Sequence, residues 1–229
     1  MTSNIIEFIF NNKIFKITDP DPNETILNFV RLKLKKTGTK EGCAEGGCGA
    51  CTIVLGDIKN NKLIYKPINS CISFLPTLNG KHLILVEDLI EENNKLHPVQ
   101  EAMVKFHGSQ CGFCTPGFTM SLFSMYKSNT SITNDVIDEA LSGNLCRCTG
   151  YRPIIDAAKS LNNLSRYDHF DKNRFITLKL LKKINRKNIE ITSNYKKYFA
   201  PKTVKDLKKI LKKAKDAKFL SGGTDLSLE

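Results

Sequence analysis

Eight cysteines carry most of the chemistry that this sequence of 229 residues could perform, and they fall into two sets of four. In the first set, Cys43, Cys48 and Cys51 follow a C-x4-C-x2-C spacing, and Cys71 comes twenty positions later. Plant-type [2Fe–2S] clusters are held by four thiolates at this kind of spacing. We therefore predict that the first set binds one such cluster.

Four glycines lie around the first three of these cysteines, at positions 42, 46, 47 and 49. A loop that wraps a compact anionic group needs positive φ angles and backbone N–H groups close to sulfur, and glycine meets both needs at least cost. Structural zinc sites usually combine a C-x2-C pair with a second such pair or with two histidines. The loop therefore favours an iron–sulfur cluster over zinc at the first set.

The second set has a C-x2-C…C-x-C order, which taken alone is compatible with zinc as well as with a second [2Fe–2S] cluster. Its members are Cys111, Cys114, Cys146 and Cys148. Cys114 directly precedes a predicted helix, and the dipole at a helix N-terminus favours nearby negative charge by about 0.3–1 kcal/mol. Arg147 is a candidate cationic neighbour. The pattern favours an anionic cluster here too, with zinc as the alternative.

We expect no catalytic residue in this chain. The sequence contains no Ser-His-Asp set, no metallohydrolase motif and no G-x-G-x-x-G nucleotide loop. His82 and His97 are expected to be surface or packing residues. His107 lies close to Cys111, but four cysteines already fill that site, so it is expected to be structural.

The first part of the chain has the pattern of a small α+β domain of ferredoxin type. Apolar and β-branched residues over 5–10 and 14–17 predict a hairpin, and Leu27, Val30 and Leu34 recur at helical spacing. Further strands are predicted over 52–55 and 62–66, with Gly56-Asp57 as the turn between them, and near 82–86.

Helical patterns follow from Pro98 onward. Helices are predicted to start at Pro98, at Thr115-Pro116, near Asn134 and near Pro153, with Gly143 capping the third of them. Four short helices of this kind form a compact bundle.

The last third of the chain has a less regular pattern. Residues 166–194 are polar and weakly patterned and predict a linker. A helix over 203–217, a short apolar strand at Phe219-Leu220 and a glycine-rich loop from Ser221 follow.

The formal net charge of +12 comes almost entirely from the C-terminal part. Residues 1–165 contain 17 Lys and Arg against 16 Asp and Glu, whereas residues 166–229 contain 18 against 7. No aromatic platform is interleaved with the lysines of the kind that single-stranded nucleic acid requires. We interpret the excess as a solvated lysine-rich helix face, and no nucleic-acid partner is expected.

The sequence has no apolar run long enough to span a membrane, and its N-terminus lacks the basic start of a signal peptide. No membrane partner is therefore expected. A cytoplasmic location is expected, where thiols stay reduced and are available to metals.

Five segments together resemble the iron–sulfur part of the molybdenum hydroxylases. They are GTKEGCAEGGCGACT (38–52), INSCISFLPTLNGK (68–81), LHPVQEAM (96–103), GSQCGFCTPGF (108–118) and GNLCRCTGYRPI (143–154). Within that family, EGCAEG and SCISFLPTL are most similar to the small iron–sulfur/FAD subunits of bacterial xanthine dehydrogenases. The resemblance covers residues 1–165, and the tail from about Tyr195 resembles the start of the flavin domain of such subunits.

The resemblance implies a fold in four parts. A β-grasp ferredoxin-like domain over 1–90 would be followed by a four-helix-bundle [2Fe–2S] domain over 91–165. A linker over 166–194 would lead to the beginning of an α/β FAD-binding domain over 195–229. Because a complete flavin domain needs far more than these 35 residues, we expect a chain truncated at the start of that domain.

The resemblance also implies a role as the electron-transfer subunit of an oxidoreductase, within a hetero-oligomer. Electrons from a molybdopterin centre on a large partner subunit would enter the second cysteine set, pass to the first set and then to FAD, which reduces NAD⁺. Gln110 matches the family position that approaches the pterin. The residues that match the FAD diphosphate loop are Phe219, Leu220, Ser221, Gly222, Gly223, Thr224, Asp225 and Leu226.

Two alternatives stay open at this point. Iron–sulfur subunits of aldehyde, carbon monoxide or N-heterocycle hydroxylases have similar motifs, although they often lack a fused flavin domain. The cysteines and the lysine-rich tail would also suit a zinc-stabilised basic binding module.

Overall fold

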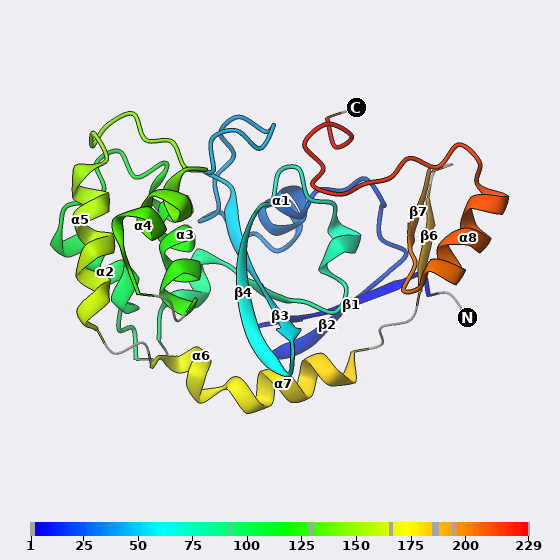
Figure 1. The fold of residues 1–229 in the computed structure, drawn as a ribbon, viewed down its shortest axis with the longest axis horizontal. Helices are drawn as coiled ribbons and strands as arrows, with labels where there is room; N and C mark the ends of the chain where they lie inside the picture. Colours follow the sequence, from blue (N-terminus) through cyan, green and yellow to red (C-terminus); the bar gives the residue numbers. More distant parts are fainter. Residues whose placement is uncertain are drawn as a thin grey trace.

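The computed structural model describes residues 3–91, 93–128, 131–164, 167–184, 188–193 and 196–228. These residues form an elongated α+β molecule with a five-stranded sheet at its centre (Figure 1). Helices α2 to α5 lie at one end, and a two-stranded sheet with helix α8 lies at the other.

The central sheet is mixed, with the strand order β2-β1-β5-β3-β4. β1 pairs in parallel with β5, and the other neighbouring strands are antiparallel. The strand bounds are Ile5–Phe10 for β1, Lys13–Thr18 for β2, Thr52–Lys59 for β3, Lys62–Asn69 for β4 and His82–Ile84 for β5.

Both hairpins of this sheet turn at Asn-Asn pairs. Asn11 and Asn12 have φ angles of 50° and 58°, and Asn60 and Asn61 have 51° and 59°. Asparagine tolerates this left-handed region, which two-residue hairpin turns require. The predicted turn at Gly56-Asp57 is therefore wrong, because β3 runs on through these residues. The glycine at position 56 avoids a close contact within the sheet, because a Cβ there would lie 3.0 Å from the Cβ of His82.

The two faces of β1 contribute to different cores. Ile6 and Phe8 point to one face, where they pack with residues of α1 (Ile26–Asn28) and of the π-helical turn Phe29–Lys33 that extends it. Ile9 points to the opposite face. This alternation is the period of two expected for a strand that is covered on both sides.

Helices α2 (Pro98–Lys105), α3 (Thr115–Lys127), α4 (Asn134–Leu141) and α5 (Arg152–Ser160) surround a second core. α3 contacts both α2 and α4, and it also packs against β3 and β4, so the helices and the sheet share buried surface. Gly143 does not have the left-handed cap conformation that the sequence predicted. The chain leaves α4 through Ser142 with a right-handed φ of −54°.

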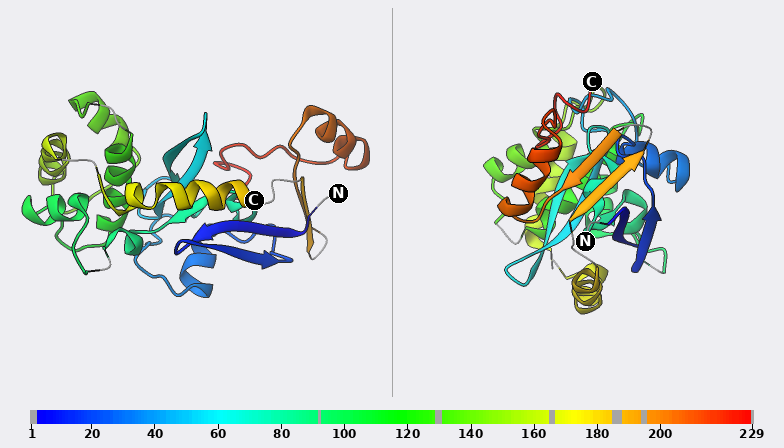
Figure 2. Two further views of the ribbon diagram at one scale, coloured as in Figure 1. Left: turned by 90° about the horizontal axis from the view of Figure 1, so that it is seen from below. Right: turned by 90° about the vertical axis from the view of Figure 1, so that its right-hand side faces the viewer.

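Residues 166–194 contain more structure than the predicted linker. Within the described residues they form α6 (His169–Lys172), α7 (Arg174–Lys183) and β6 (Ile189–Ser193). Leu181 and Ile184 pack on Ile9, so α7 covers the face of β1 opposite to α1 (Figure 2).

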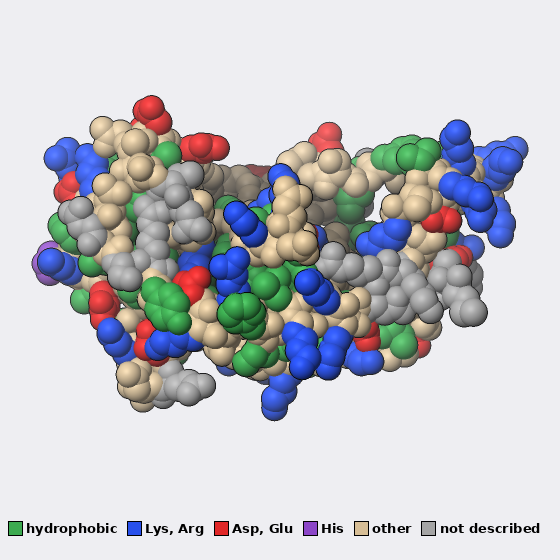
Figure 3. Space-filling model, turned by 60° about the horizontal axis from the view of Figure 1, so that its bottom comes forward, with side chains coloured by type: hydrophobic (Ala, Val, Ile, Leu, Met, Phe, Trp, Pro, Cys, Tyr) green, Lys and Arg blue, Asp and Glu red, His purple; other side chains and the backbone are tan. Residues whose placement is uncertain are grey.

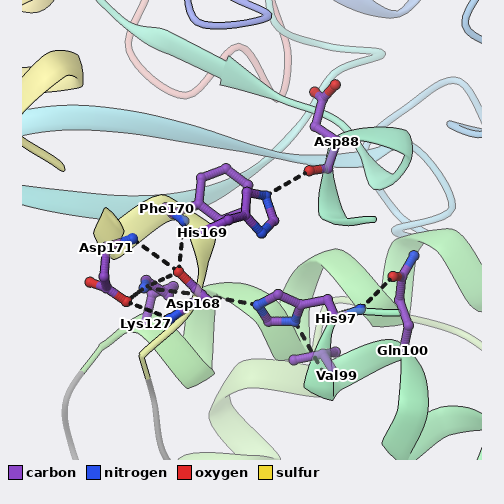
Figure 4. A network of polar contacts seen from close by, with 9 residues as sticks. All are labelled: Asp88, His97, Val99, Gln100, Lys127, Asp168, His169, Phe170 and Asp171. Carbon is purple, nitrogen blue, oxygen red and sulfur yellow. Dashed lines mark hydrogen bonds and ion pairs between the residues drawn. The ribbon is translucent and has the colours of Figure 1, made fainter. Parts of the chain in front are cut away.

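The start of this segment is tied to the helical core by a buried polar network (Figure 4). The Asp168 carboxylate accepts hydrogen bonds from Nε2 of His97 at 3.0 Å and from Nζ of Lys127 at 3.0 Å. Nδ1 of His97 accepts from the Val99 N–H, so the ring proton lies on Nε2. Burial alone would raise the pKa of Asp168, but the hydrogen bond from His97 and the charge of Lys127 outweigh it and lower this pKa.

The C-terminal part forms β6 and its partner β7 (Lys196–Ala200), followed by α8 (Val204–Lys213). α8 has no buried residue, and lysine and arginine side chains gather at its end of the molecule (Figure 3). Phe219 and Leu220 do not form the predicted strand, because the chain there pairs with no other strand and Phe219 is 67% exposed. No helix of the described residues is long and apolar enough to cross a membrane.

Candidate metal centres

The first cysteine set gathers where the loop before β3 meets the turn after β4. Sγ of Cys51 lies 3.3 Å from Sγ of Cys71, and both residues are buried. Sγ of Cys43 accepts backbone N–H groups of Glu45 at 3.4 Å and of Gly47 at 3.2 Å. Sγ of Cys48 likewise accepts a hydrogen bond from the N–H of Cys43 at 3.4 Å. N–H donors directed at sulfur suit an anionic centre.

Two glycines allow the loop of the first set to take this path. Gly46 and Gly49 have φ angles of +80° and +69°, in the left-handed region where a side chain is strained. A Cβ on Gly46 would also lie 2.7 Å from Cδ1 of Ile72, next to Cys71. The Nδ2 of Asn69 holds the loop in place by donating to the Gly46 carbonyl at 2.8 Å.

The second set gathers between the starts of two helices. Cys114 is the N-cap residue of α3, and Cys146 and Cys148 lie in the turn that leads into α5. Sγ of Cys146 accepts the Thr149 N–H at 3.4 Å. Since the N-terminus of a helix favours anions, two such ends on one site suit a negatively charged group.

The thiols are arranged in pairs, and in two of these pairs the two pKa values are shifted in opposite directions. A hydrogen bond from Cys71 lowers the pKa of Cys51 to about 6, while the same contact raises the pKa of Cys71. In the second set, burial raises the pKa of Cys114 to about 12, and the thiol of Cys114 is hydrogen-bonded to the thiol of Cys146. Within such a pair, the thiolate that ionises first accepts a hydrogen bond from the remaining S–H. When both thiols are deprotonated, a metal cation takes the place of that shared proton.

The paired arrangement bears on which metal group the sites could hold. In the second set, Cys111 pairs with Cys148 and Cys114 with Cys146. A single zinc requires four convergent ligands, whereas a [2Fe–2S] cluster takes two thiolates on each of two irons. The donor set therefore fits the binuclear cluster.

The two sets are joined through the main chain. The N–H of Leu145, beside Cys146, donates to the carbonyl of Cys48 at 2.9 Å. Nδ2 of Asn144 donates to the next carbonyl, that of Gly49, at 3.0 Å. The loops that carry the two sets therefore contact each other directly.

Two family models match the chain over the segments that carry the cysteines. A "2Fe-2S iron-sulfur cluster binding domain" matches residues 9–75, and a "[2Fe-2S] binding domain" matches residues 85–159. Among curated relatives, the xanthine dehydrogenase of Blastobotrys adeninivorans is 48% identical over 163 residues, and aldehyde oxidase 1 of Oryctolagus cuniculus is 46% identical over 142 residues. These alignments cover 70% and 61% of this chain.

A solved structure extends the comparison to nearly a whole relative. The quinoline 2-oxidoreductase of Pseudomonas putida 86 has a chain that is 33% identical, superposes with a TM-score of 0.56, and is matched over 92% of its length and 69% of ours. This chain belongs to the iron–sulfur region of the molybdenum hydroxylases. It spans 12% of the length of the xanthine dehydrogenase relative and 11% of the aldehyde oxidase.

Outside the matched iron–sulfur segments, part of the predicted FAD loop lies against the turn that carries Cys71. Leu220, Ser221, Gly222 and Gly223 line a cavity of about 440 Å³ together with Ile72 and neighbouring residues. A Cβ on Gly223 would lie 2.6 Å from the Ile72 carbonyl.

The other predicted cofactor residues are not part of this cavity. Thr224, Asp225 and Leu226 do not line this cavity, and Phe219 points to solvent. Gln110 is exposed beside the exposed Cys111.

Sequence reasoning missed several residues that support the molybdenum hydroxylase sites. The hydroxyl of Tyr151 accepts the N–H of Cys146 at 3.0 Å, and Oγ of Ser227 donates to the Ile72 carbonyl at 2.7 Å. Asn144 bridges the two sets. Asn144 and Tyr151 lie inside a quoted motif, which was the available signal, whereas Ser227 lies outside all five. The contacts of Asn144 and Ser227 also join residues too far apart in the chain to follow from spacing.

Proposed function

We propose that this chain transfers single electrons within a xanthine dehydrogenase, through one [2Fe–2S] cluster in each cysteine set. The clusters would supply the one-electron redox chemistry, and the chain would hold them with four thiolates each and with N–H groups directed at sulfur. The observation that carries the proposal is the presence of two paired thiol sets whose loops are hydrogen-bonded to each other through Leu145 and Cys48.

The proposed direction runs from the second set to the first. Cys111 and Cys148 are exposed, and Phe113 and Leu145 beside them are 47% and 57% exposed, which suits contact with a molybdopterin-binding large subunit. Gln110, on the same surface, would approach the pterin. Cys51 and Cys71 are buried in the chain, so the first set suits an internal relay.

We propose FAD as the next acceptor and NAD⁺ as the final one. The cavity beside Ile72 supports this order, because it lies between the turn that carries Cys71 and the glycine-rich tail. The residues proposed to contact the FAD diphosphate are 219–226.

The proposed domain organisation follows the cysteine sets. Residues 1–90 would form a β-grasp ferredoxin-like domain and residues 91–165 a four-helix bundle. The chain from 195 would begin the flavin domain, with 166–194 connecting the two.

Aldehyde oxidation is the second candidate for the whole enzyme. It is favoured by the identity to aldehyde oxidase 1, which is close to that with xanthine dehydrogenase. The electron-transfer role of this chain is the same in both cases.

The test of electron transfer uses the whole chain, purified without oxygen. It should be reddish-brown, contain about four irons and take up two electrons in a dithionite titration, as expected for two all-cysteine clusters. A colourless protein with stoichiometric zinc would contradict the proposal and favour the zinc-stabilised module.

The substrate is tested with a molybdopterin-binding large subunit added to the loaded chain. Xanthine should bleach the clusters. Bleaching by an aldehyde and not by xanthine would favour the second candidate.

A further inference from the structure

Three backbone segments meet between the two cysteine sets. Gly49 lies between Cys48 and Cys51, Gly117 follows Cys114 by three residues, and Asn144 precedes Cys146 by two. A Cβ on Gly117 would lie 2.2 Å from the Gly49 carbonyl oxygen, and one on Gly49 would lie 2.5 Å from Nδ2 of Asn144. The loops therefore approach each other more closely than side chains normally allow.

Asn144 is a buried polar side chain that bonds residues of both domains at this contact. It is 4% exposed, and both ends of its amide are used. Oδ1 accepts from the Ser121 hydroxyl on α3 at 2.6 Å, and Nδ2 donates to the Gly49 carbonyl at 3.0 Å and to Oγ1 of Thr52 at 3.3 Å. An amide is required here, because only Asn or Gln both donates and accepts from one short planar group.

A neighbouring main-chain hydrogen bond reinforces this contact, and we call the two hydrogen bonds, from Asn144 and from Leu145, the clamp. Asn144 and Leu145 bond two consecutive carbonyls of the first loop, those of Gly49 and Cys48. Two adjacent bonds to adjacent carbonyls fix the orientation of the loops as well as their distance. Cys48 and Cys146 are thereby linked by one hydrogen bond and a short stretch of main chain.

We propose that Asn144 is a positioning residue that sets the separation of the two clusters and so the rate of electron exchange between them. The inference rests on the proposed function. In the exchange, one cluster loses one electron and the other gains it, with no bond made or broken, so the rate depends on the distance and the connection between the two centres. Loss of the Asn144 amide would loosen the clamp and slow the exchange without removing any cysteine.

The test compares Asn144→Asp with Asn79→Asp in the whole chain. The first change removes the donor to Gly49 and places a carboxylate against that carbonyl. The second makes the same substitution at an amide whose bond, from the N–H of Glu7 to Oδ1 of Asn79 at 2.9 Å, lies within the first domain. Both variants should keep about four irons and two paramagnetic signals.

The readouts are the magnetic interaction between the two reduced clusters, which falls with the cube of their separation, and the rate of electron exchange after partial reduction. A third readout, hydrogen exchange of the Leu145 amide, needs no redox activity. Asn144→Asp should weaken the magnetic interaction, slow electron exchange severalfold and speed hydrogen exchange at Leu145. Asn79→Asp should leave all three readouts at the wild-type values.

Wild-type values of all three readouts in a folded Asn144→Asp would overturn the inference. If that variant does not fold, Thr52→Val decides. It removes the hydroxyl that bonds both the Asn144 amide and the Gly49 carbonyl, and an unchanged magnetic interaction there would contradict the clamp. A wild-type chain without cluster signals would instead count against the proposed function itself.

Discussion

The α-carbon of Gly117 lies so close to Gly49 that an added methyl group would sit 2.2 Å from the Gly49 carbonyl oxygen. This contact joins the start of α3 to the loop of the first cysteine set. It leaves no room for any other residue at position 117.

We therefore expect Gly117→Ala to destabilise the protein by about 1–3 kcal/mol, as overpacking in a rigid site does. The gain of about 1 kcal/mol in helix propensity offsets part of this cost. Thermal or denaturant unfolding of the loaded chain measures the difference. Gly143→Ala is the matched control, because a Cβ there meets nothing within 4 Å, and it should change stability by less than about 0.5 kcal/mol. Equal effects of the two changes would contradict the tight contact.

Lys127 neutralises two carboxylates at the edge of the helical core. Its side chain is 5% exposed and pairs with Asp168 and Asp171. Lys127→Met should cost about 3–5 kcal/mol, because it leaves the buried Asp168 charge without its cation. Hydrogen exchange should rise first in α6 and α7, which follow Asp168 in the chain. Lys172→Met, at an exposed lysine of the same segment, should have little effect, and similar losses in both variants would argue against the network.

His82 makes stability depend on pH. Burial lowers its pKa to about 4, so the folded protein does not protonate it between pH 6.5 and 4, whereas the unfolded chain does. Because the unfolded state binds more protons in this window, stability falls as the pH falls, by up to about 3 kcal/mol from this group. Burial raises the pKa of Asp88 to about 6, and that carboxyl contributes the opposite slope.

The contribution of His82 is isolated by subtraction. The slope of unfolding free energy against pH should be flatter in His82→Gln than in the wild type between pH 4 and 6.5, while Asp88 acts equally in both. Parallel curves for the wild type and His82→Gln would show that His82 does not titrate as its burial requires.

Removal of the clusters should loosen the cysteine loops before the sheet. The thiols and N–H groups of loops 40–51 and 143–151 are organised around the proposed clusters, whereas β1 and β3 pack in apolar cores. A chain stripped with chelator and reductant should lose hydrogen-exchange protection in these loops and keep it in the strands. For each kcal/mol lost, Tm should fall by about 2–4 °C in a chain of this size. Unchanged protection of the loops would mean that they are ordered without a metal group.

The sequence was sufficient to predict the elements that are determined by neighbouring residues. The C-x4-C-x2-C loop, the hairpin at Asn11-Asn12 and the helix after Cys114 all follow from residues close together in the chain. The turn predicted at Gly56 was wrong because a glycine can mark either a turn or a crowded position in a strand. Only the position of His82 on the neighbouring strand distinguishes these two possibilities.

The features that could not be predicted from the sequence depend on long-range packing. Asn144 meets Gly49 across 95 positions of sequence, and no spacing rule relates them. α7 was missed because Phe175 and Ile176 are exposed while Leu181 is buried, so its apolar residues do not form one clean face. Its position depends on Ile9, which lies on the sheet.

The central claim is that each cysteine set holds its own [2Fe–2S] cluster, and Cys48→Ser and Cys146→Ser test it most directly. Iron content and the paramagnetic signals of the reduced chain should be measured for both variants and the wild type. Each variant should keep about two irons and lose one signal, a different one in each case. Loss of both signals in a folded variant, or the same signal lost in both variants, would contradict two independent sites.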